Sequence, residues 1–265
     1  MKVNVMNKSF KLGLALIAAG VTTFAGIAMA AESDEPVKQM EWPHKGAFGT
    51  FDRAALQRGL TVFENVCSNC HSLKYVHYRN LEELGFTEDE VKAIAAKVMV
   101  EDGPNDDGDM FERPAKPSDP FRSPFANEQL ARASNGGALP PDLSVMVEAR
   151  EGHENYIYSL LTGYQDPPAD VKMQAGKSYN PYFNGGQISM PPPLTADAVE
   201  YADGTPATLE QEAHDVVTFL AWAAEPNLEE RKELGFKVMV FMAILTVLLI
   251  LSNRKIWKKI KSQNT

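Results

Sequence analysis

The sequence predicts an all-α outer domain with long loops, followed by one C-terminal transmembrane helix. Apolar residues recur at helical spacing in several segments, and no region is rich in strand signals. Residues 234–251 form one apolar run with a single charge, Lys237, close to its start. At 265 residues the chain could hold one large domain or two small ones, and we see no internal repeat.

The N-terminus has the pattern of a secretory leader. Three lysines lie within the first 11 residues, residues 12–27 are largely apolar, and Ala28-Met29-Ala30 matches a cleavage signal of small residues. We therefore predict a signal peptide over residues 1–30 and a mature chain that begins near Ala31. The alternative is an anchor helix that is not cleaved.

The first helix of the outer domain should lead into a cysteine motif. Asp52 can cap a helix in which Leu56, Leu60 and Phe63 share one face. Directly after this helix comes the segment Cys67-Ser68-Asn69-Cys70-His71. The motif should therefore lie at the C-terminal end of the helix.

The spacing Cys67-x-x-Cys70-His71 is the attachment signal for c-type haem. Two thiols about one helical turn apart can each add to a vinyl group of one porphyrin, and the next residue can offer an imidazole to the iron. A redox dithiol would favour a βαβ pattern, and a zinc site would need a second Cys/His cluster; the sequence shows neither. We predict one covalently bound c-type haem with His71 as an axial ligand.

Short helices separated by long loops should follow the motif. Thr87 and Glu90 form a capping box for a helix that extends to about Val100. The next segment, residues 101–109, is an acidic loop with Gly and Pro. We expect further helices over residues 127–133, 143–150 and 155–161, and irregular chain over residues 31–48 and 166–182.

Two helices should close the chain. Thr208 can cap the first of them, and Pro226 could kink it. A long helix over residues 228–259 would then run from the outer domain into the membrane. We assign the membrane span to residues 234–252 and a cytoplasmic tail to residues 253–265, because basic residues favour the cytoplasmic side. The alternative is a helix buried in a soluble core.

The charge of the chain is unevenly distributed. The formal net charge is −9. The leader holds three lysines and residues 234–265 hold six basic residues, with no acidic residue in either part, so residues 31–233 carry −18. Such a domain would repel nucleic acid and suits a basic protein partner. The loop at 101–109 is a candidate docking surface, although many acidic loops are only solvated.

Met190 is the candidate for the second axial ligand of the haem iron. It lies between Gly185-Gly186 and Pro191-Pro192-Pro193, in a stiff loop that can hold a weak thioether–iron bond. Methionine more often packs in a core, so an open iron face, as in a haem enzyme or gas sensor, is the alternative. The other histidines fit hydrogen-bonding roles better than ligation. They are His44, His77, His153 and His214.

Four segments match one family in combination. They are residues 67–80, which hold the cysteine motif, residues 135–144 (NGGALPPDLS), residues 156–164, which include SLLTGY, and residues 188–191 (ISMP). With the C-terminal anchor and its lysine-rich tail, they resemble the cytochrome c1 family, the haem subunits of cytochrome bc1 complexes. The resemblance implies a class I cytochrome c-like haem domain over residues 31–233.

The resemblance also implies roles for residues around the haem. Arg150 would pair with a haem propionate, which a guanidinium suits, or would form only a surface ion pair. Tyr156 and Leu160 would pack on the ring, and His71 and Met190 would ligate the iron. Further residues would line the haem pocket: Asn135, Ala138, Pro140 and Pro141. Some bacterial members hold the methionine loop with an extra disulfide, for which this chain has no cysteines.

The function implied by the resemblance is electron transfer from a Rieske iron–sulfur subunit to a soluble cytochrome c that docks on the acidic face. Cytochrome b and the lipid bilayer would be further partners, within a dimeric complex of the bacterial inner membrane. The haem domain would lie in the periplasm, and this chain would hold no catalytic site of its own. Alternatives are a membrane-anchored cytochrome c of another dehydrogenase or oxidase, and the open-iron protein above.

Overall fold

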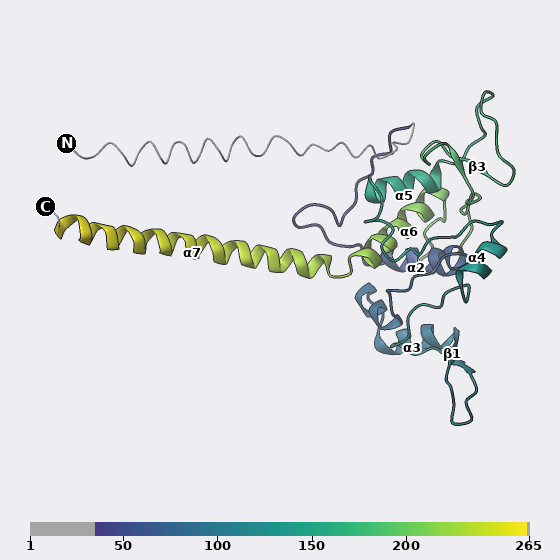
Figure 1. Ribbon diagram of the computed structural model, residues 1–265, viewed down its shortest axis with the longest axis horizontal. Coiled ribbons are helices and arrows are strands. Elements are labelled where there is room, and N and C mark those ends of the chain that lie inside the picture. Colours follow the sequence, from purple (N-terminus) through teal and green to yellow (C-terminus); the bar gives the residue numbers. More distant parts are fainter. Residues whose placement is uncertain (1–34, 264–265) are drawn as a thin grey trace. The chain divides into compact units, whose positions relative to one another are not determined.

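The computed structural model describes residues 35–263, with side chains as far as residue 258. The predicted signal peptide over residues 1–30 therefore lies outside the described residues. The helices are α2 (Arg53–Asn65), α3 (Glu88–Ala96), α4 (Glu128–Ser134), α5 (His153–Thr162), α6 (Leu209–Ala224) and α7 (Leu228–Gln263) (Figure 1). Two 3₁₀ helices are η1 (Cys67–Asn69) and η2 (Tyr78–Leu84). Two antiparallel strand pairs are β1 (Met99–Asp102) with β2 (Phe111–Pro114), and β3 (Ser178–Tyr179) with β4 (Gln187–Ile188).

The mainly helical architecture confirms the predicted fold class, and the local helix signals hold. The side chain of Asp52 accepts hydrogen bonds from two backbone N–H groups in the first turn of α2. Thr87 and Glu90 form the complete capping box of α3, and Thr208 caps α6. These side chains satisfy N–H groups that have no partner within the helix, which fixes where each helix starts.

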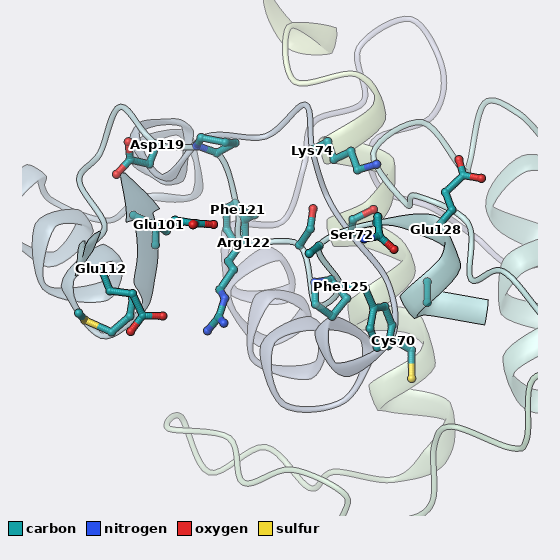
Figure 2. A pocket seen from close by; sticks show the side chains of 18 of the residues that line it. Cys70, Ser72, Lys74, Glu101, Glu112, Asp119, Phe121, Arg122, Phe125 and Glu128 are labelled. Carbon is teal, nitrogen blue, oxygen red and sulfur yellow. The ribbon is translucent and has the colours of Figure 1, made fainter. Parts of the chain in front are cut away.

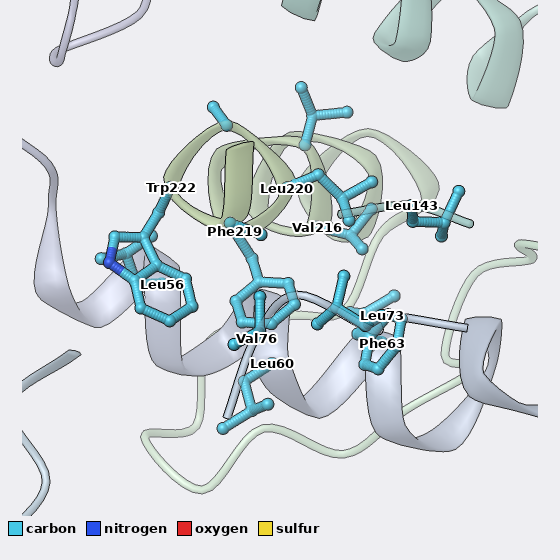
Figure 3. Packing of buried hydrophobic residues seen from close by; sticks show 14 of the residues in the cluster. Leu56, Leu60, Phe63, Leu73, Val76, Leu143, Val216, Phe219, Leu220 and Trp222 are labelled. Carbon is cyan, nitrogen blue, oxygen red and sulfur yellow. The ribbon is translucent and has the colours of Figure 1, made fainter. Parts of the chain in front are cut away.

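The core is built where α2 meets α6 (Figure 3). The apolar face predicted for α2, Leu56, Leu60 and Phe63, is buried against Phe219 and Leu220 of α6. The two backbones approach so closely at Gly59 that a Cβ there would lie 2.1 Å from the carbonyl oxygen of Asp215. Only glycine fits this position without displacing one of the helices.

A buried ion pair joins the same two helices. Asp215 is fully buried on α6, and its carboxylate accepts hydrogen bonds from Nε of Arg58 on α2 at 2.8 Å and from Nε2 of Gln211 at 2.9 Å. Burial raises the pKa of Asp215, but these hydrogen bonds, with one from His214, hold it below its ordinary value of 3.8. The carboxylate is therefore charged and fully engaged within the interface.

The helix predicted after Thr87 is shorter than the sequence indicates. The helix after Thr87 was expected to reach Val100, but α3 ends at Ala96 and residues 99–102 pair with residues 111–114 instead. The carbonyl of Val98 accepts a hydrogen bond from Ala115 N at 2.8 Å, which draws this segment away from the helix and into the hairpin.

The predicted helix over residues 143–150 is also wrong, because the structure has only turns there. The amide of Leu143 donates to the carbonyl of Ser72 at 2.9 Å, so the segment is held from outside rather than by its own helical bonds. Pro226, which could have kinked the helix after Thr208, instead lies between two helices: α6 ends at Ala224, and α7 starts at Leu228, as predicted.

The segment before α2 has no helix or strand between residues 36 and 50, as predicted, yet it is firmly attached. His44 is 1% exposed, and its Nε2 lies 2.9 Å from Oε1 of Glu154 on α5. Nζ of Lys45 lies 2.7 Å from the other oxygen of the same carboxylate. Trp42 stacks on His214 of α6 with ring centroids 4.8 Å apart. This segment therefore connects α5 with α6.

Helix α7 is long and apolar enough to cross a membrane. The stretch Leu228–Lys258 has 31 residues, its most apolar window has a mean hydropathy of 2.6, and none of that window is buried within the described chain. The one charge within residues 234–251, Lys237, forms an ion pair of 2.6 Å with Glu233, one turn nearer the polar end. Length and composition thus support the predicted anchor, whereas its exact limits and the position of its tail stay predictions.

The α2–α6 contact yields a stability prediction. Gly59→Ala should lower the free energy of unfolding by roughly 1–3 kcal/mol, the usual cost of overpacking a core, even though alanine is the better helix former. Gly235→Ala in α7 is the matched control, because nothing lies within 4 Å of a Cβ there. Its unfolding midpoint should be equal to or slightly above that of the wild type in denaturant titrations followed by circular dichroism. A Gly59→Ala protein as stable as wild type would contradict the close helix contact.

Glu154 yields a pH prediction. Burial raises the pKa of this carboxyl, but its bonds to His44 and Lys45 prevail and lower the pKa from 4.5 to about 2. A carboxyl with a lowered pKa in the folded state stabilises the protein above its ordinary pKa, and this stability is lost as the pH falls towards about 2. Glu154→Gln should therefore flatten the fall of the melting temperature between pH 4.5 and about 2. If the melting temperatures of the wild type and of Glu154→Gln fall in parallel as the pH is lowered, the Glu154 carboxylate does not contribute this stability.

Candidate haem-attachment site

The cysteine motif forms one tight turn at the end of α2. The amides of Cys70 and His71 both donate to the carbonyl of Cys67, at 3.1 and 2.9 Å. This turn brings the two cysteines and the histidine into the compact arrangement that attachment to one porphyrin edge requires. Burial, with a smaller contribution from Cys70, raises the pKa of the Cys67 thiol to about 12. Redox-active dithiols have lowered pKa values, so this environment disfavours the dithiol alternative.

The imidazole of His71 is oriented by a backbone carbonyl. Its Nδ1 lies 2.8 Å from the carbonyl oxygen of Pro141, so Nδ1 carries the proton and donates it in this bond. Burial lowers the pKa of His71, and the bond to Pro141 and the charge of Asp142 offset only part of that shift. The ring is therefore neutral, with the lone pair on Nε2, which is the form that binds a metal ion.

Asp142 holds the carbonyl of Pro141 in place, a role that the sequence analysis missed. Its carboxylate accepts hydrogen bonds from Oγ of Ser72 at 2.7 Å, from the amide of Lys74 at 3.0 Å and from the amide of Ser144 at 2.9 Å. Burial raises the pKa of Asp142, but these bonds keep it below its ordinary value. An acidic residue directly after Pro140-Pro141 was the available signal, because Asp often caps the turn that follows it.

A cavity of about 780 Å³ lies against the motif. Cys70, Ser72 and Lys74 form one side of it, and Glu101 and Glu112 from the β1–β2 hairpin lie across from them (Figure 2). Of the other predicted haem residues, Pro140 lines the wall, whereas His71 and Met190 are not among the described residues that do so. The cavity therefore borders the attachment cysteine without bringing the two predicted iron ligands together.

The structure places Met190 in a loop that is fixed to α5. Its carbonyl accepts a hydrogen bond from the hydroxyl of Tyr164 at 3.1 Å, and its side chain is half-buried. Asn180, fully buried in the same loop region, donates from Nδ2 to the carbonyl of Leu160 at 2.7 Å. These two bonds connect the loop to α5, which carries Tyr156 and Leu160, and to the chain just after its end. Sequence reasoning assigned no role to Tyr164 or Asn180.

The remaining predicted pocket residues form mainly local hydrogen bonds. Asn135 ends α4 and donates from Nδ2 to the carbonyl of Ala131, and the amide of Ala138 donates to the carbonyl of Asn135. Arg150 is exposed and donates to the carbonyl of Ala149. Burial raises the pKa of Tyr156, and the positive charge of Arg150 opposes this. The guanidinium thus acts electrostatically on one side chain predicted to contact the haem.

The donor set around the motif fits a covalently attached haem. Two thiols in one turn can form thioethers, and a neutral imidazole with a fixed proton leaves Nε2 for the iron. The half-buried thioether of Met190, in a loop fastened at two points, is suited to a weak axial bond. Groups of three or more His, Cys, Asp or Glu that could hold a separate metal ion are absent from the described part of the chain.

Comparison with known proteins agrees with this chemistry. The model of the Cytochrome C1 family matches residues 42–260. A cytochrome c1 of Rhodospirillum rubrum is 48% identical over 264 residues, covering 93% of this chain and 97% of the relative. A mitochondrial cytochrome c1 heme protein of Arabidopsis thaliana is 48% identical, covering 94% and 83%. A Candida albicans protein named as a catalytic subunit of the mitochondrial cytochrome b-c1 complex is 49% identical, covering 84% and 77%. The chain therefore belongs to the cytochrome c1 family.

Proposed function

We propose that this chain is the haem-carrying, membrane-anchored electron-transfer subunit of a cytochrome b-c1 complex. The observation that carries the proposal is the bond from His71 Nδ1 to the carbonyl of Pro141, inside a Cys-x-x-Cys-His turn of a cytochrome c1 chain. The haem, when bound, supplies a one-electron couple between ferric and ferrous iron. The chain supplies the thiols, the oriented imidazole and the loop of Met190, and the complex around it would supply the reactions with quinol.

The proposed direction of electron flow is the one that the family resemblance implies. The chain would receive an electron from a Rieske iron–sulfur subunit and pass it to a soluble cytochrome c, alongside cytochrome b in a dimeric complex. The relative from Candida albicans, named as a subunit of that complex, supports this assembly. The long apolar helix α7 supports a single membrane crossing. We place the haem domain in the periplasm and the basic tail in the cytoplasm of a bacterial inner membrane.

The acidic loop is the proposed docking surface for the soluble cytochrome. It forms the tip of the β1–β2 hairpin, where Oδ1 of Asn105 accepts hydrogen bonds from the amides of Asp107 and Asp109. Arg113 on β2 forms ion pairs with Asp102, at the loop end of β1, and with Asp119, which follows β2, and so holds the hairpin in place. A negatively charged tip on a fixed support suits steering of a basic partner, because its field keeps a defined orientation.

Substitution of Met190 tests the iron ligation. Met190→Leu removes the thioether, so the reduced protein should bind carbon monoxide at neutral pH and the midpoint potential should fall. Met173→Leu, at another half-buried loop methionine, is the control and should keep the wild-type spectrum. The readouts are optical spectra with and without carbon monoxide and a redox titration. Carbon monoxide binding by the wild type, or an unaltered Met190→Leu spectrum, would favour an open iron face.

Neutralisation of the loop tip tests the docking surface. The triple change of Asp106, Asp107 and Asp109 to Asn should slow electron transfer to a basic cytochrome c by roughly tenfold at low salt. The two proteins should converge above about 0.1 M salt, where charges more than ~10 Å apart are screened. The control neutralises three other exposed acids, Asp166, Asp170 and Glu200, with the same change in net charge. Equal rates for both triple variants would leave net charge, and not the loop, as the cause.

A further inference from the structure

One strongly exposed aromatic side chain lies beside the start of α7. Phe48, in the segment before α2, is 81% exposed, the highest value among the large hydrophobic side chains described. Its ring meets that of Phe236 on α7 edge to face, with centroids 6.2 Å apart. Through this contact the ring joins the exposed apolar surface of α7 in one contiguous patch. Contiguous apolar patches of this kind mark contacts with a partner outside the chain.

The loop that carries Phe48 is fixed to the first turns of α7. Nζ of Lys232 donates to the carbonyls of His44, at 2.6 Å, and of Gly49, at 2.9 Å, on the two sides of Phe48. The amide of Phe51 donates to Oε1 of Glu229 at 2.7 Å. The loop is also tight, because a Cβ on Gly49 would lie 2.0 Å from the carbonyl oxygen of Lys45. Phe48 is therefore held at one level along the helix.

That level coincides with the change from polar to apolar residues on α7. Arg231 and Lys232 precede it, and Leu234 and Phe236 open the apolar stretch with 62% and 59% exposure. Lys232 and Phe236 are four residues apart, which is about 6 Å along a helix. The charge of Lys237 is turned back to Glu233, towards the polar side. A bilayer surface that begins at Leu234 would thus reach Phe48 as well.

We propose that residues 46–49 form an interfacial foot, in which Phe48 enters the boundary between lipid headgroups and acyl chains beside Phe236. The inference rests on the proposed membrane crossing of α7. Its partner is the lipid bilayer, because the exposed ring continues the apolar surface of the helix. Gly46, Ala47 and Gly49 add little bulk around the ring, so the loop backbone can approach the headgroups. A single helix leaves the attached domain free to turn and tilt, and this second contact fixes its height and orientation.

Depth measurement with a spin label tests the foot. The only cysteines of the natural chain are the two that attach the haem, so a nitroxide can be placed on Phe48→Cys alone in the full-length, haem-loaded protein. The protein is reconstituted in phosphatidylcholine–phosphatidylglycerol nanodiscs. Collision rates with oxygen, which concentrates in lipid, and with a water-soluble nickel complex then report depth. Phe236→Cys marks the membrane helix, and Ala196→Cys marks an exposed position in the outer domain.

For the label at Phe48, the ratio of the collision rate with oxygen to that with the nickel complex should be several-fold above the ratio at Ala196. It should be close to the ratio at Phe236. If the label at Phe48 collides with the nickel complex as often as the label at Ala196 does, while the label at Phe236 reports lipid, the interfacial foot is overturned. The membrane anchor is then unaffected. Protection of the Phe48 label from both reagents would also overturn it and would indicate burial against protein. Nickel access at Phe236 would show that the anchor itself fails, and the foot with it. An unchanged haem spectrum checks folding, and Ala47→Cys repeats the measurement one residue away.

Discussion

The imidazole of His71 can offer only one nitrogen to a metal, and the carbonyl of Pro141 decides which one. Their 2.8 Å hydrogen bond holds the proton on Nδ1 and leaves Nε2 free. This bond depends in turn on Asp142, whose carboxylate joins the segment after Pro141 to Ser72 and Lys74. The orientation of His71, the proposed ligand, is therefore set by a few hydrogen bonds between segments about 70 residues apart. Metal sites commonly need such supporting bonds behind their ligands.

The loop of Met190, the proposed second ligand, is supported differently. A disulfide would stabilise such a loop by typically ~2–4 kcal/mol, but the chain has no cysteine outside the haem motif. Asn180 and Tyr164 instead connect the loop to α5 and its end, and each hydrogen bond adds about 1 kcal/mol. Because Asn180 is fully buried, breaking its bond would also leave a polar group without a partner, which makes the attachment more specific than its net energy suggests.

The sequence predicted what short-range chemistry determines. Asp52, Thr87 and Thr208 act within one helical turn, so their capping roles could be read from spacing alone. Predictions failed where distant segments compete for the backbone: the bond from Leu143 to Ser72 replaces a helix with turns, and pairing with residues 111–114 ends α3 early. The residues of the Cys67–His71 motif could also be predicted, because they are close in sequence. Asp142 and Asn180 instead contact segments distant in the chain, and sequence reasoning assigned them no role.

Glu154 shows why a polar connection between the outer domain and the membrane helix is useful. Its buried carboxylate is paired with His44 and Lys45, and the carbonyl of His44 accepts from Lys232 of α7. Buried ion pairs often stabilise a fold no more than well-packed apolar residues would. An apolar contact, however, tolerates sliding and rotation, while this set of directional bonds is satisfied in one arrangement only. These linked contacts between Glu154, His44 and Lys232 therefore favour a fixed orientation of α7 relative to α5. Helix α5 also supports the loop of Met190.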